Sequence, residues 1–132
     1  MVFFIPKFIY SLLHDQSITV HKGHKRIIDF VGDSCSTWAN IVENFIPGKA
    51  YNVGGRIEWE KSIEEYAEII LSITGRSNAL LNLKDAEEHT TIVKTIDFSE
   101  AIKDLKHNPK VDPEEGIRRT VDWMNFHYRI AR

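Results

Sequence analysis

The sequence contains a single cysteine, Cys35, among its 132 residues. One cysteine has no intrachain partner, so an internal disulfide is excluded and a reducing, cytoplasmic compartment is expected. Because Cys35 lies in an apolar pattern with helical spacing, we expect a packed thiol rather than a nucleophile.

Excess positive charge and long apolar runs are also missing. With 17 basic and 19 acidic side chains, the chain has no surplus of cations to neutralise a phosphate backbone, which disfavours nucleic-acid binding. The apolar opening, residues 1–13, is interrupted by Pro6 and Lys7 and is shorter than the roughly 20 residues of a membrane span. It also lacks the features of a signal peptide. We therefore expect buried core there, and no membrane partner.

Several catalytic patterns are absent. No G-x-G-x-x-G turn is present to hold a dinucleotide, and no tyrosine precedes a lysine by four residues, the spacing of a proton-transfer pair. His21 and His24 have no cysteine or carboxylate nearby at ligand spacing, which favours solvated loop histidines over a metal site. The sequence predicts no catalytic residue, metal or bound cofactor in this chain.

The pattern that is present alternates helices with short strands, and the length suits one domain, residues 1–132. Helices are predicted at 6–13, from a cap at Asp33 or Ser34 to Pro47, at 62–75, from Ser99 and from Asp112. Strands are predicted at 17–21, 26–31, 50–53, 80–83 and 92–96. The expected fold is a small mixed α/β domain with several helices and short strands.

Two helices have strong terminal signals. Ser62 and Glu65 form a capping box, and Gly75 suits the end of the same helix. Asp112 is a good cap for the last helix, with Pro113 at its first position.

The turn Lys22–Arg26 concentrates positive charge, with Lys22, Lys25 and Arg26 within five residues. It is either a solvated turn or an anion clamp, for which the rigid donor fork of arginine is well suited.

Four segments then carry a resemblance in their order and spacing: KRIIDFVGD, KAYNVGG, SIEEYAEIIL and DPEEGIRRTVDWM. Together they resemble the carboxyl-terminal, substrate-binding part of the extended short-chain dehydrogenase/reductases, specifically the NAD-dependent sugar-nucleotide epimerases and dehydratases of the dTDP-glucose 4,6-dehydratase or UDP-glucose 4-epimerase type. The likeness extends from Ile5 to Met124.

The resemblance implies that the two halves of such enzymes have different roles. The amino-terminal Rossmann half of such enzymes holds NAD or NADP and the catalytic residues, so this chain is expected to bind the nucleotide-diphosphate sugar and to be inactive alone. Arg26 matches the arginine of the family pattern R-D-F-x-Y-V-x-D, which contacts a substrate phosphate. Val20 and His21 would lie near the nucleobase. Lys94 is a further phosphate candidate, with a solvated lysine as its alternative.

The chain also departs from that pattern, because Ile27 replaces the aspartate and Phe30 the tyrosine. These changes imply a different selectivity for base or diphosphate. In the family the YNVGG strand and the helix before it return to the Rossmann sheet, so we expect self-association or an amino-terminal Rossmann partner. The alternative functions are a non-catalytic interaction or nucleotide-sugar-sensing module, and a small α/β domain of unrelated function.

Overall fold

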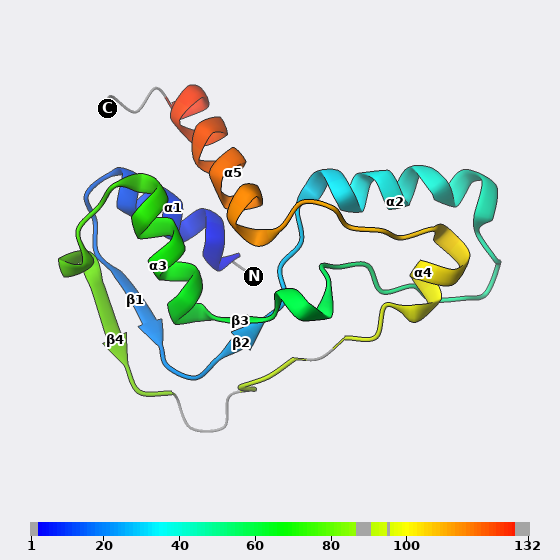
Figure 1. Cartoon of the computed structure of the whole chain (residues 1–132), viewed down its shortest axis with the longest axis horizontal. Coiled ribbons are helices and arrows are strands. Elements are labelled where there is room, and N and C mark those ends of the chain that lie inside the picture. The colour runs from blue at the N-terminus through cyan, green and yellow to red at the C-terminus, as the bar shows by residue number, and fades with distance from the viewer. Residues whose placement is uncertain (1–2, 87–90, 95, 129–132) are drawn as a thin grey trace.

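The computed structural model describes residues 3–86, 91–94 and 96–128. This part of the chain folds into five α-helices and four short strands, which confirms the predicted small α/β fold (Figure 1). The helices are α1 (Phe4–Leu13), α2 (Val31–Asn44), α3 (Ile63–Thr74), α4 (Ser99–Leu105) and α5 (Pro113–Tyr128), and the strands are β1 (Ile18–His21), β2 (Lys25–Arg26), β3 (Lys61–Ser62) and β4 (Leu81–Lys84). None of the helices in the described part is long and apolar enough to span a membrane.

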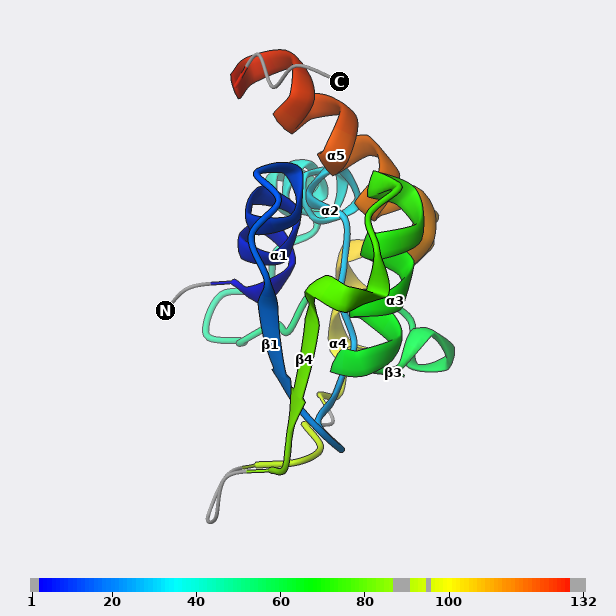
Figure 2. The ribbon, with the colours of Figure 1, turned by 90° about the vertical axis from the view of Figure 1, so that its left-hand side faces the viewer.

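The main core lies between helices α1, α3 and α5 and strand β1. Strand β1 pairs in parallel with β4, with Ile18 opposite Leu81, and the two strands run side by side (Figure 2). Ile9 of α1, Ile70 of α3 and Ile117 of α5 are at most 1% exposed in this core. In the apolar opening, Phe8, Ile9, Leu12 and Leu13 are buried, as predicted, whereas Phe3 is 71% exposed and residues 1–2 lie outside the described part of the chain.

Helices α2 and α4 form a second group at the other end of the molecule (Figure 1). The side of α2 that meets α4 is polar: the Asn40 amide donates to the backbone carbonyl of Leu105 at 3.0 Å, and Thr37 meets His107. Hydrogen bonds, rather than a broad apolar face, thus attach α2 to its neighbour.

Most large apolar residues of α2 point to solvent instead, although Ile41 is half-buried. Trp38 is 62% exposed and Val42 is 89% exposed, and Phe45 follows just beyond the helix in the same spacing. Cys35 is exposed as well, so the prediction of a packed thiol is wrong. The pattern was read correctly as helical, but the structure leaves its apolar stripe uncovered.

Three predicted strands are shorter than expected or missing. Strand β2 stops at Arg26, because its antiparallel partner β3 has only two residues, and α2 already begins at Val31. Residues 50–53 form no strand, since no described strand lies beside them. In the predicted strand 92–96, Val93 makes a single parallel bridge to Lys25, and Thr95 lies outside the described residues. A strand needs a paired neighbour along its length, and among the described residues these segments have a very short one or none.

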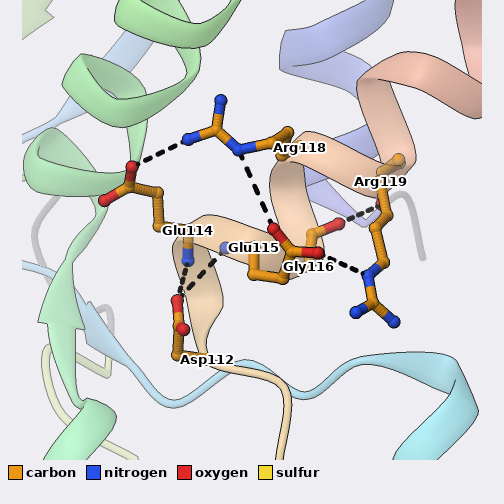
Figure 3. A network of polar contacts seen from close by, with 7 residues as sticks. Asp112, Glu114, Glu115, Gly116, Arg118 and Arg119 are labelled. Atoms are coloured by element: carbon orange, nitrogen blue, oxygen red, sulfur yellow. Dashed lines mark hydrogen bonds and ion pairs between the residues drawn. The ribbon is translucent and has the colours of Figure 1, made fainter.

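The strong helix signals are confirmed. Ser62 and Glu65 form both halves of the capping box of α3, and Gly75 ends that helix with a φ of 66°. At the start of α5, the Asp112 carboxylate accepts hydrogen bonds from the amides of Glu114 and Glu115 at 3.0 and 3.1 Å (Figure 3).

The predicted cap of α2 is wrong. No side chain caps this helix, whose N-cap residue is Phe30. The Asp33 carboxylate instead accepts hydrogen bonds from the amides of Lys110 and Val111, at 3.0 and 2.8 Å. Asp33 therefore fastens the segment that leads into α5, a long-range contact that local spacing does not reveal.

Candidate anion-binding site around Arg26

The turn between β1 and β2 is held by the first residues of α3. Gly23 has a φ of 81°, which glycine adopts without strain, and its amide donates to the Glu64 carboxylate at 2.7 Å. The amide of Ile63 donates to the carbonyl of His24 at 2.8 Å. A helix N-terminus therefore fixes the start of β2, where Arg26 lies.

The Arg26 guanidinium is oriented by three backbone carbonyls. Its Nη1 donates to Lys25 at 2.5 Å and to Ile92 at 2.9 Å, and its Nη2 donates to Thr91 at 3.1 Å. A guanidinium has five N–H groups, so Nε–H and one N–H of Nη2 keep no partner among the described residues. When Nη2 uses the N–H that faces Nη1 for Thr91, these two donors share one edge of the guanidinium, which matches two oxygens of a phosphate or carboxylate.

Residues 91–94 lie beside β2 and bring Lys94 toward Arg26 along the chain. The amide of Lys25 donates to the carbonyl of Ile92 at 2.9 Å, and Val93 bridges Lys25 in parallel. Lys94 follows directly and is exposed. The structure thus places the backbones of two predicted phosphate contacts in neighbouring segments.

The other two predicted contacts lie on β1. His21 ends the strand, half-buried, with its Nδ1 3.2 Å from the carbonyl of Asp85. Val20 is 1% exposed and its side chain is part of the core, so only its backbone is available to a ligand. The four predicted residues therefore differ: Arg26, His21 and Lys94 have accessible side chains, and Val20 does not.

Each of the two lysines of the turn lies near an acidic side chain. Lys22 lies 3.4 Å from the Asp85 carboxylate, and Lys25 lies 4.0 Å from that of Glu60. Pairs of this kind on the surface contribute little to stability, so these lysines are available to an anionic ligand at small cost. In the described residues, no group of three or more histidine, cysteine, aspartate or glutamate side chains could hold a metal ion.

Sequence reasoning missed the role of Tyr66 at this site. Tyr66 lies on the apolar face of α3 and is fully buried there. Its hydroxyl, however, lies 3.1 Å from the carbonyl of Arg26 and 3.1 Å from that of Trp59. Burial raises the pKa of the phenol to about 12, so the hydroxyl remains a donor at neutral pH. The only sequence signal was an aromatic residue with a polar tip on a core face.

A separate cluster of charges joins the segment before YNVGG to α4. Lys49 contacts the carboxylates of Glu100 and Asp104, and the Tyr51 hydroxyl donates to Asp104 at 3.1 Å. The hydrogen bond from Lys49 lowers the pKa of Asp104 and raises that of Lys49. This cluster lies in the α2–α4 group and fixes the loop there.

Comparisons with known proteins agree with the resemblance. The human dTDP-D-glucose 4,6-dehydratase is 27% identical over 132 aligned residues, which cover 93% of this chain and 37% of the human protein. The dTDP-glucose 4,6-dehydratase of Actinoplanes is 28% identical over 130 residues, covering 97% of this chain and 39% of that protein. No family model matches the chain.

Solved structures show the same fold. The dTDP-glucose 4,6-dehydratase of Bacillus anthracis, in complex with NAD, matches 95% of this chain with a TM-score of 0.80 and 22% identity, over 40% of its own length. The UDP-glucose 4-epimerase of Thermotoga maritima, with UDP-glucose, matches 96% of this chain with a TM-score of 0.83 and 20% identity, again over 40% of its length.

The predicted resemblance is therefore confirmed: the chain corresponds to a portion of the NAD-dependent sugar-nucleotide epimerases and dehydratases. It spans less than half the length of the relatives and structures that it matches.

Proposed function

We propose that residues 1–132 form one substrate-binding domain, the part of an NAD(P)-dependent sugar-nucleotide epimerase or 4,6-dehydratase that binds the nucleotide-diphosphate sugar. By itself the domain is not catalytically competent, because it carries neither the glycine-rich dinucleotide turn nor the tyrosine–lysine pair. We place this function in the cytoplasm.

The observation that carries the proposal is the orientation of Arg26. Three carbonyls fix its guanidinium, so the two-donor edge is set before a ligand arrives and little side-chain entropy is lost on binding. A diphosphate presents paired oxygens that such an edge binds in bidentate fashion. Lys94 adds positive charge beside it, and His21 with the backbone of Val20 lies toward the nucleobase.

The exposed apolar stripe of α2 supports the proposal that a partner covers this helix. Trp38 and Val42 present apolar surface on the side of α2 that no described element covers, and residues 50–53 form no strand. A parallel sheet would cover the apolar face of the helix and would give residues 50–53 a strand to pair with. The proposed partner is an amino-terminal Rossmann half that holds NAD or NADP, and self-association is the other way to cover the same surface.

Calorimetric titration of the whole chain with UDP-glucose and dTDP-glucose tests the proposed ligand. We expect saturable binding to at least one of them, and its loss in Arg26→Ala. Arg118→Ala is the matched control, because the exposed Arg118 pairs with Glu114 of its own helix, α5 (Figure 3). A folded chain that binds neither sugar nucleotide contradicts the proposal.

The second candidate is a non-catalytic module for protein interaction or nucleotide-sugar sensing. The uncovered α2 stripe favours it, because the same surface suits a partner that is not a Rossmann half. Sugar-nucleotide binding together with activity after addition of an NAD-binding half selects the first function. Binding with no activity in such a mixture selects the second.

A further inference from the structure

We propose that Tyr66 is a positioning residue for the anion site: its hydroxyl joins the carbonyls of Arg26 and Trp59 and thereby fixes the direction of the Arg26 guanidinium. The inference rests on the proposed function for its ligand. The positions of the Tyr66 hydroxyl and of the Arg26 side chain come from the contacts in the structure and do not depend on that ligand.

The hydroxyl adds a buried contact between two segments that the pairing of β2 with β3 already joins. It is 3.1 Å from each carbonyl, and its single proton serves both acceptors. Strand β2 has two residues and pairs with a strand of two residues, so its ladder is short. The buried hydrogen bond therefore adds to the few backbone contacts that hold Arg26 in place.

The ring of Tyr66 is itself immobile. It is fully buried in the core on α3, and its centroid lies 5.8 Å from that of Phe4. A tightly packed ring holds the hydroxyl at a fixed point, so the packing of the main core also restrains the position of strand β2. Trp59, whose carbonyl is the second acceptor, ends a short 3₁₀ turn, η1 (Ile57–Trp59). The Cζ atom of Arg56 lies over the Trp59 ring, 5.5 Å from its centroid.

The consequence for Arg26 follows from its own hydrogen bonds. Its side chain donates to the carbonyl of Lys25 on β2 and to the carbonyls of Thr91 and Ile92 in the neighbouring segment. The guanidinium therefore keeps its direction only while β2 and that segment keep their relative positions. Removal of the phenolic oxygen leaves two carbonyls without this donor and lets β2 move. The ring still fills the core, because phenylalanine has the same shape.

The test uses Tyr66→Phe in the whole chain, with Tyr51→Phe as the matched control. Tyr51 also loses a hydroxyl that donates, but to Asp104 in the α2–α4 group. The first readout needs no ligand: the ¹H–¹⁵N signal of the Arg26 Nε–H group, assigned by its loss in Arg26→Ala, with amide hydrogen exchange of residues 25–28 and 60–62. We expect Tyr66→Phe to broaden or shift the Arg26 signal and to speed exchange in both segments by about three- to tenfold. Tyr51→Phe leaves both unchanged.

The second readout is a double-mutant cycle on the binding of UDP-glucose, dTDP-glucose and inorganic pyrophosphate. Tyr66→Phe is expected to weaken binding by about three- to tenfold in the wild-type background, and not to weaken it further once Arg26 is alanine. Equal weakening in both backgrounds means that Tyr66 acts through general stability and overturns the inference. So does an Arg26 signal unchanged by Tyr66→Phe. If no anion binds the wild-type chain, the proposed function fails, while the Arg26 signal and exchange still decide the positioning role.

Discussion

The hydroxyl of Thr37 and the ring of His107, seventy positions apart in the chain, lie 2.8 Å from each other and are both buried. The opposite ring nitrogen, Nε2, lies 2.7 Å from the carbonyl of Gly54, which only accepts, so Nε2 carries a proton. One histidine therefore ties α2 and the YNVGG segment to the end of α4.

His107→Leu is expected to lower the free energy of unfolding by about 1–3 kcal/mol, because the Gly54 carbonyl and the Thr37 hydroxyl lose their buried partner. Urea unfolding monitored by circular dichroism measures the change. His14→Leu is the control, since His14 is exposed and bonds only within its own helix end. Equal stability of His107→Leu and the parent chain contradicts the role given to this ring.

Alkaline pH is expected to weaken the fold through Tyr66. Its folded pKa of about 12 lies above that of an exposed tyrosine, near 10, so the folded chain retains a proton that the unfolded chain releases. The contribution of the Tyr66 phenol to the free energy of unfolding is complete below about pH 10 and is lost as pH rises toward 12. Urea midpoints at pH 8, 10 and 11 measure the fall, which Tyr66→Phe is expected to reduce. An identical fall in both chains rules out Tyr66 as its source.

Low pH is expected to destabilise the fold through protonation of Asp104. The Lys49 hydrogen bond lowers the pKa of this carboxyl, so its stabilising effect is present above the ordinary aspartate pKa and is lost as pH falls through the folded value. Asp104→Asn is expected to narrow the difference in urea midpoint between pH 7 and pH 3. Asp122→Asn, at an exposed position of α5, serves as the comparison. The same narrowing in both variants would contradict a specific role for Asp104.

The apolar stripe of α2 is expected to cause association of the isolated chain. Val42→Lys removes its most exposed member without touching the core, so the molar mass measured by light scattering is expected to fall toward that of a monomer, with thermal stability unchanged. Trp123→Lys, on the exposed side of α5, is the control. A wild-type chain that is already a monodisperse monomer contradicts self-association.

Local signals predicted the helices well because they depend on neighbouring residues. The capping box of Ser62 and Glu65 and the cap at Asp112 each involve contacts within three residues, which spacing reveals. The strand at 50–53 and the cap at Asp33 failed for the opposite reason. A strand depends on a neighbour from elsewhere in the chain, and Asp33 bonds amides 77 and 78 positions away.

The site was predictable only in part. The family pattern pointed to Arg26, and the structure shows a guanidinium that three backbone carbonyls orient. The roles of Thr91 and Ile92 in orienting it, and of Tyr66 behind it, depend on contacts across 40 or more positions. Nothing in their spacing marks them, because backbone carbonyls carry no residue signature.

The most direct test of the central claim follows the Arg26 Nε–H signal while UDP-glucose or dTDP-glucose is added to the wild-type chain. Bidentate contact with a diphosphate is expected to move this signal in a saturable way, while the signal of Arg118 stays in place. The same affinity should appear by calorimetry. Saturable binding with an unmoved Arg26 signal would place the ligand elsewhere on the molecule, and no binding of either sugar nucleotide would contradict a substrate-binding domain.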